Sequence, residues 1–154
     1  MGTTTAAEKA KKWVEGKVTR GLPNRNPIEG LAMQDLVVVE AEDGRILCRF
    51  VVPKHLSDGE GNWSAGAVAT LIDVVAAASI ITRTSRIFVS VDFSISYFST
   101  AVIEEEVEIE GRLVGEGKGK LRAVEVEIRR RRDRELVALG REWMTSVDLP
   151  ESKL

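Results

Sequence analysis

Cysteine and histidine, two residue types common in metal and catalytic sites, are almost missing from this sequence. Its 154 residues include one cysteine, Cys48, and one histidine, His55. A lone cysteine cannot form an intramolecular disulfide, and one residue of each type cannot complete the ligand set of a structural zinc site. Cys48 also lies in an apolar, strand-like stretch, where a small core residue is the expected role. The sequence therefore predicts neither a disulfide scaffold nor a metal site.

An excess of charge of one sign is absent as well. Lysine and arginine number 22, aspartate and glutamate number 24, and the formal net charge is −2 at pH 7. This balance gives no electrostatic reason to expect nucleic acid or an anionic membrane as a partner. The apolar stretch 65–81 is slightly short for a membrane span and contains Asp73. We therefore expect a buried helix there.

The order of the helix and strand patterns predicts a single α+β domain over residues 1–154. Residues 5–18 fit a short amphipathic helix and residues 21–30, with two prolines and two glycines, fit a loop, so residues 1–32 form an N-terminal helix and loop. Two strand patterns flank Asp43-Gly44, a strong hairpin signal. Further strand patterns follow the long helix at residues 87–98, 102–114, 120–131 and 135–147. About six antiparallel strands and one long helix predict a sheet wrapped around that helix.

Two runs of charge lie on the predicted hairpin of residues 102–131. One is acidic, residues 104–106, and the other is basic, residues 129–132. A turn near Glu116-Gly117 would place residue 104 across from about residue 130, so that the two runs pair across neighbouring strands. We favour this structural interpretation over the alternative, a basic patch that holds phosphate groups.

Asp73 is the one charged residue within the apolar helical stretch. The nearest charged residues along the chain are Glu60 and Arg83. Small residues leave room for a ligand against the helix, and partial burial strengthens a carboxylate as a base. Helical spacing places Asp73 on one face with Gly66, Ala69, Thr70, Ala76, Ala77 and Ile80. We favour a catalytic role for Asp73 over an aspartate that faces solvent or is satisfied by Thr70.

The residues before this helix form a glycine-rich loop, DGEGNWSAG, at positions 58–66. Asn62 or Ser64 is expected to be the N-cap. The backbone N–H groups of Ala65 and Gly66 would then be free donors at the positive end of the helix, where they can hold a developing oxyanion. A well-capped structural helix would show the same residues, so the isolated carboxylate two turns later is the stronger signal.

Three segments together are typical of one protein family: GNWSAGAVATLID at 61–73, VSVDFSISYFSTA at 89–101 and GREWMT at 140–145. They resemble the small acyl-CoA thioesterases of the hot-dog fold, relatives of the bacterial phenylacetyl-CoA and hydroxybenzoyl-CoA thioesterases. The resemblance extends over residues 33–147 and agrees with the element order predicted above. It implies an acyl-CoA substrate and a homodimer or homotetramer with active sites at the subunit interface. We expect no metal or redox cofactor.

The resemblance also implies a role for each matching residue. Asp73 takes the place of the helix carboxylate, which acts as general base on water or as nucleophile on the thioester carbonyl. Ala65 and Gly66 take the place of two glycines whose amides hold the oxyanion. Ser90 takes the place of a strand serine that helps to position water. Strict alternation over residues 89–97 would put Ser90 on the polar strand face, either against the partner subunit's site or in a structural role.

Three positions depart from the family pattern. Ala65 stands at the first of the two glycines, and the loss of that glycine's backbone freedom can move the loop. Ser64 stands where these thioesterases commonly have histidine, and Asp58 where they have an asparagine that assists from the partner subunit. A carboxylate at position 58 would repel a developing oxyanion. Asn62 could replace the family asparagine only if the loop rearranged.

The favoured hypothesis is hydrolysis of a fatty or aromatic acyl-CoA to the free acid and CoA. The alternative is a protein that binds acyl-CoA without cutting it, because the changes at Asp58 and Ser64 have removed turnover. A hot-dog dehydratase is less favoured, since its usual histidine is missing from the helix. The last three residues, Ser152, Lys153 and Leu154, match the peroxisomal address SKL. We therefore expect a peroxisomal protein that binds the import receptor.

Overall fold

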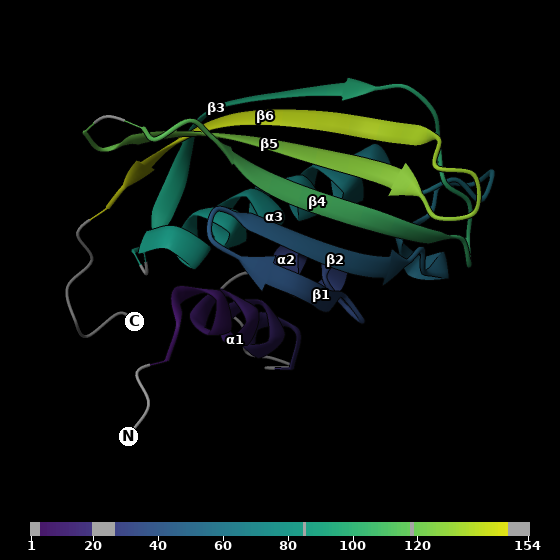
Figure 1. Ribbon diagram of the computed structural model, residues 1–154. Coiled ribbons are helices and arrows are strands. Elements are labelled where there is room, and N and C mark those ends of the chain that lie inside the picture. The colour runs from purple at the N-terminus through teal and green to yellow at the C-terminus, as the bar shows by residue number, and fades with distance from the viewer. Residues whose placement is uncertain (1–3, 20–26, 85, 118, 148–154) are drawn as a thin grey trace.

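The computed structural model describes residues 4–19, 27–84, 86–117 and 119–147 of the chain. Helices and strands follow the predicted order (Figure 1). The elements are α1 (Ala6–Thr19), α2 (Pro27–Ala32), β1 (Val37–Glu42), β2 (Arg45–Val51), a short 3-10 helix (Lys54–Leu56), α3 (Ala65–Thr84), β3 (Phe88–Tyr97), β4 (Glu106–Val114), β5 (Leu121–Arg130) and β6 (Leu136–Ser146).

The six strands form one antiparallel sheet in the order β1-β2-β4-β5-β6-β3. The long helix α3 lies along one face of this sheet, as Figure 1 shows. The predicted α+β architecture, an antiparallel sheet around one long helix, is confirmed. Strands β1 and β3 form the two edges of the sheet, and within the described part of the chain β3 is bonded on one side only, to β6.

Two glycines let α3 approach the sheet closely. A Cβ atom on Gly111 of β4 would lie 3.0 Å from the backbone oxygen of Val75. A Cβ atom on Gly140 of β6 would clash with the side chain of Ile72. These two positions therefore fix the distance between the helix and the middle of the sheet, and with it the place of every side chain that α3 presents.

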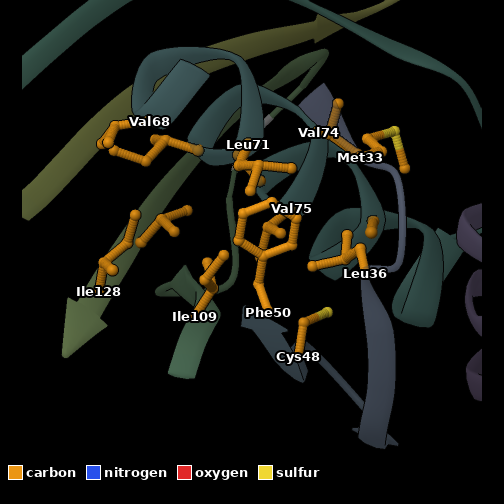
Figure 2. Close-up of a cluster of buried hydrophobic side chains, with 14 of the residues drawn as sticks. Met33, Leu36, Cys48, Phe50, Val68, Leu71, Val74, Val75, Ile109 and Ile128 are labelled. Atoms are coloured by element: carbon orange, nitrogen blue, oxygen red, sulfur yellow. The ribbon is translucent and has the colours of Figure 1, made fainter. Parts of the chain in front are cut away.

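The core lies between α3 and the sheet. Leu71, Ile72, Val74 and Val75 of the helix are all buried. Figure 2 shows Leu71 and Val75 beside Phe50 of β2, and Val74 beside Met33. The helix is long and apolar enough to cross a membrane, but it is mostly buried within the domain, which is typical of a core helix. Cys48 is fully buried in this cluster, as expected, and burial raises the pKa of its thiol to about 12.

The N-terminal segment differs from the prediction in one respect. Helix α1 is confirmed, but the loop expected at 21–30 is wrong from Pro27 onward, where α2 begins. Proline has no N–H and its φ suits the first turn, so it favours a helix start as well as a loop. Residues 20–26 lie outside the described part of the chain. Helix α2 matters for the site because Ile28 and Glu29 face α3 there.

The acidic and basic runs pair across the β4–β5 hairpin, as the structural interpretation predicted. Arg131 donates to Glu106 over 2.8 Å, and Arg132 lies 2.7 Å from Glu105. The expected register was wrong by three residues, since Val107 rather than residue 104 lies opposite Arg130. The ion pairs form all the same, because long arginine side chains reach past the strand end. These charges thus stabilise the hairpin.

Candidate active site

Asp73 lies midway along α3 and is partly exposed. Ser90 of β3 donates a hydrogen bond from its Oγ to Asp73 Oδ1, over 2.5 Å. The strict alternation predicted for β3 is wrong at this point, because the strand has a β-bulge between Ser90 and Asp92. The extra residue moves Ser90 to the face of the strand that looks toward α3. Both residues predicted as catalytic are therefore in direct contact within one chain.

A surface cleft of about 390 Å³ opens at this pair. We call it the Asp73 cleft. It is lined by Ile28, Glu29, Ala69, Thr70, Asp73, Ser90 and Phe93. The predicted face of small residues is confirmed for Ala69 and Thr70, but it is wrong for Ala76 and Ile80, which are fully buried in the core. Thr70 donates a hydrogen bond to the Gly66 carbonyl. The less favoured alternative, in which Thr70 is the hydrogen-bond partner of Asp73, is therefore wrong.

A second carboxyl group, Glu142 of β6, lies behind Asp73 and was missed by the sequence analysis. Its side chain is 1% exposed, and neither of its oxygens accepts a hydrogen bond from any described residue. The group that it faces is Asp73, and two carboxyl groups can share a hydrogen bond only when one of them carries a proton. Burial, the negative charge of Asp73 and the hydrogen bond to it raise the pKa of Glu142 to about 8. Glu142 is therefore protonated at neutral pH.

Ser64, one of the two residues expected to be the N-cap, caps α3. Its Oγ accepts a hydrogen bond of 3.3 Å from the Ala67 amide. The amides of Ala65 and Gly66 come first in the helix, both residues are exposed, and neither amide finds an acceptor among the described residues. They are free donors at the positive end of the helix, as predicted.

The loop before the helix is built around Asp58. Its Oδ1 accepts hydrogen bonds from the amides of Glu60 and Asn62, each over 2.9 Å. These bonds hold the pKa of Asp58 below its ordinary value, the bond from the Asn62 amide contributing most. Asp58 is thus a carboxylate committed to the loop, and it has no proton to donate. Asn62 also points its side-chain amide at Asp58, over 3.4 Å.

A second cleft, of about 330 Å³, lies beside the start of the helix. We call it the helix-start cleft. It is lined by Asp58, Asn62, Trp63, Ala65, Val68, Tyr97, Ser99, Thr100, Ala101 and Val137. Tyr97, which the sequence analysis did not single out, donates a hydrogen bond of 3.0 Å from its hydroxyl to the Ala65 carbonyl. This bond ties the end of β3 to the first turn of α3.

The predicted site residues thus form two groups on the same chain. Asp73 and Ser90 line one cleft, while Asp58, Asn62 and Ala65 line the other. Gly66 and Asp73 are seven residues apart, which places them about 10 Å apart along a helix that rises 1.5 Å per residue. Oxyanion donors and a base must both lie within about 3 Å of the reacting atoms. One chain therefore cannot bring its two groups to the same carbonyl.

A family model described as the thioesterase superfamily matches residues 60–137. The chain belongs to this superfamily. Human acyl-coenzyme A thioesterase 13 is 28% identical over 107 residues, which cover 69% of this chain and 76% of that protein. The matched region of the superfamily model includes both Asp73 and Ser90 but ends before Glu142.

Two solved structures show the same fold. Zebrafish thioesterase superfamily member 2 superposes with a TM-score of 0.80 at 22% identity, over 95% of this chain and 100% of that one. A Streptococcus mutans protein bound to acetyl CoA superposes with a TM-score of 0.70 at 20% identity, over 77% and 93%. The resemblance and the hot-dog fold are confirmed, and the prediction of a thioesterase is confirmed at the level of the superfamily. Among the described residues no group of acidic, histidine and cysteine side chains is placed to hold a metal ion.

Proposed function

We propose that this protein hydrolyses acyl-CoA thioesters to the free acid and CoA in the Asp73 cleft. The observation that carries the proposal is the hydrogen bond from Ser90 to Asp73, which sets a carboxylate at the floor of an open cleft. Membership of the thioesterase superfamily supports the reaction class. The human relative named for acyl-CoA and the bacterial structure bound to acetyl CoA support the choice of thioester.

Asp73 acts as the general base in this proposal. Its carboxylate takes a proton from a water molecule as the water oxygen adds to the thioester carbonyl. Ser90 holds one carboxylate oxygen, so the other is left to face the water. The tetrahedral intermediate then expels the CoA sulfur, which receives the proton from Asp73. If Asp73 instead attacked the carbonyl as a nucleophile, it would expel the CoA thiolate and form an anhydride. Water that then added at the Asp73 carbon of this anhydride would leave ¹⁸O label in the Asp73 side chain after a single turnover in labelled water.

The oxyanion donors come from a second copy of the chain. The amides of Ala65 and Gly66 are free and exposed, but they lie two helical turns from Asp73 of the same chain. A homodimer in which the helix-start cleft of one copy meets the Asp73 cleft of the other would complete the site. Strand β3 borders both clefts, through Phe93 and Tyr97, and therefore lies where such an interface has to form.

The edge of β3 has the properties of a subunit interface. The strand is ten residues long and has no partner on its outer side among the described residues. Val89, Val91 and Phe93 are each at least 40% exposed. A long, apolar edge strand is a template for pairing with another chain. Antiparallel pairing of two β3 strands would cover these side chains and join the two sheets.

Oligomeric state is tested by light scattering on a sizing column with one matched pair of variants. Val91→Lys places a charge on the edge of β3, while Val114→Lys places one on the end of β4, and the two valines are 55% and 54% exposed. Val91→Lys should give a monomer without thioesterase activity, and Val114→Lys should keep the parent's mass and activity. A tetramer mass for the parent would show a further interface. A monomeric parent, or a dimeric and fully active Val91→Lys variant, would refute the interface.

The second candidate is a protein that binds acyl-CoA without cutting it. The environment of Asp58 favours this alternative, because the carboxylate is held in its charged form by loop amides and cannot donate to an oxyanion. Measuring the release of the CoA thiol from straight-chain and aromatic acyl-CoA esters distinguishes the two candidate functions. Release, and its dependence on Ser90, would support hydrolysis. Tight binding without release, together with turnover gained in Asp58→Asn, would support a binding protein.

We also propose import into peroxisomes through Ser152, Lys153 and Leu154. These residues lie outside the described part of the chain, and the proposal rests on their match to the SKL address. A fluorescent protein fused to the N-terminus should accumulate in peroxisomes, and removal of the three residues should leave it diffuse. An unchanged distribution after removal would refute the proposal.

A further inference from the structure

Glu142 is the one described carboxyl side chain buried within the core. It projects from β6 on the face that carries Ala138, Gly140 and Met144, all of them packed under α3. Its exposure is 1%, and no lysine or arginine among the described residues forms an ion pair with it. A buried carboxylate without a cation or a hydrogen-bond donor is strongly disfavoured. The side chain is therefore kept as the neutral acid by its surroundings.

Among the described residues, the elements packed around Glu142 bring one ionisable group against it. Strand β3 places Phe93 opposite Glu142, and β5 places Val124 opposite it on the other side. Arg122 lies further along β5, where its guanidinium donates to the carbonyls of Gly119 and Leu121. Helix α3 places Asp73 against the carboxyl group.

On the outer side of Asp73, Glu29 of α2 lines the same cleft and is paired with Lys17 of α1. Ser90 donates to one oxygen of Asp73. Asp73 is thus the only charged group that faces Glu142 among the described residues, and it meets a hydroxyl donor on one side and a buried acid on the other.

We propose that Glu142 is a positioning residue of this site: as the neutral acid it donates a hydrogen bond to Asp73 and, with Ser90, fixes the orientation of that carboxylate toward the attacking water. This inference rests on the proposed hydrolysis. It adds a residue from a third element, β6, to a pair contributed by α3 and β3. Two donors on one carboxylate restrict its rotation about the Cβ–Cγ bond, which a single hydroxyl does not.

The arrangement links activity to the protonation of Glu142. Loss of its proton removes the hydrogen bond and places a second negative charge beside Asp73, so the two carboxylates repel each other. The pKa of Glu142, raised to about 8 by burial and by Asp73, sets the pH of this change. The rate of hydrolysis should therefore fall as the pH rises through about 8.

Two variants separate positioning from packing. Glu142→Gln keeps a donor toward Asp73 and cannot ionise, while Glu142→Met fills a similar volume without a donor. Glu142→Gln should keep kcat within about threefold of the parent at neutral pH and should lose the fall in rate near pH 8. Glu142→Met should lower kcat by about tenfold to a hundredfold at unchanged KM, which is the cost of a misplaced catalytic group.

A second measurement reports on the same contact without turnover. Carbon-13 NMR of the glutamate side-chain carboxyl groups should show one that titrates near pH 8 in the parent, that is missing in Glu142→Gln, and that titrates at lower pH in Asp73→Asn. A signal for Glu142 that titrates in the ordinary glutamate range would overturn the proposal, whatever the kinetics.

The kinetic outcomes separate this proposal from the proposed function. If the parent releases CoA and Glu142→Gln still loses rate near pH 8, or Glu142→Met keeps the parent's kcat, the role of Glu142 is refuted and hydrolysis stands. If the parent releases no CoA from any ester, the proposed function fails and the positioning role fails with it.

Discussion

Glutamine in place of Glu142 should make the free energy of unfolding less dependent on pH. In the folded protein, burial beside Asp73 raises the pKa of Glu142 from its ordinary value of 4.5 to about 8. Between these values the folded state binds one proton more than the unfolded state, so the free energy of unfolding falls as the pH rises. The stability contributed by this proton is fully present below about pH 4.5, and it is lost as the pH rises through about 8.

The size of the effect follows from the two pKa values. Each pH unit between them costs about 1.4 kcal/mol. Between about pH 5.5 and pH 8 the parent should lose ~3 kcal/mol of unfolding free energy through Glu142, and Glu142→Gln should lose none of this. For a chain of this length, that difference corresponds to roughly 6–12 °C in the midpoint of thermal unfolding.

Urea unfolding at the two pH values, at one fixed protein concentration, measures the effect. Glu125→Gln is the matched control, because Glu125 lies on the neighbouring strand and pairs with Arg141 at the surface, over 3.2 Å. The control should follow the parent's pH dependence to within about 0.5 kcal/mol. If Glu142→Gln and the parent lose the same free energy between the two pH values, Glu142 is not a buried acid and the reasoning is wrong.

Two further substitutions test the placement of α3. Ser64→Ala removes the N-cap of α3 and should lower the free energy of unfolding by about 1 kcal/mol; an unchanged value would show that the cap bond to Ala67 does not stabilise the helix. Gly140→Ala puts a methyl group into the side chain of Ile72 and should cost about 1–3 kcal/mol. Its control is Gly16→Ala in α1, where a Cβ would meet nothing within 4 Å, which should raise stability by up to about 1 kcal/mol. Equal effects of both alanines would contradict the close approach of helix and sheet. Urea unfolding measures all three.

The sequence alone predicts the architecture and singles out Asp73 and Ser90, which are in contact in the structure. Helical periodicity, the Asp43-Gly44 turn and the strand patterns depend on neighbours close in sequence, and the elements that they predict are present in the structure. Asp73 is identifiable because a carboxylate without charged neighbours in an apolar helix is unusual and therefore indicates a functional role. These signals are local, so they can be recognised in the sequence without any knowledge of tertiary contacts.

The β-bulge in β3 and the buried acid Glu142 were both missed from the sequence, for different reasons. The β-bulge near Ser90 arises where β3 pairs with β6, and no residue pattern within β3 predicts it. Glu142 carried a signal that could have been used, since alternation along β6 places it on the same face as Ala138, Gly140 and Met144. A carboxylate on an apolar strand face is as unusual as one in an apolar helix. The separation of Gly66 and Asp73 along α3, in contrast, follows from their spacing in the sequence and the rise of a helix. Only the other side chains that line each cleft depend on how the helix packs against the sheet.

The most direct test of the account is the rate of CoA thiol release by Asp73→Asn, compared with the parent and with Asp92→Asn. Asp92 is exposed and lies on the opposite face of β3 from Ser90. With the ester that the parent cleaves fastest, Asp73→Asn should lose about a hundredfold or more in kcat, the cost of removing a general base. Asp92→Asn should keep the parent's rate. Hydrolysis by Asp73→Asn at the parent's rate would contradict the assignment of the active site.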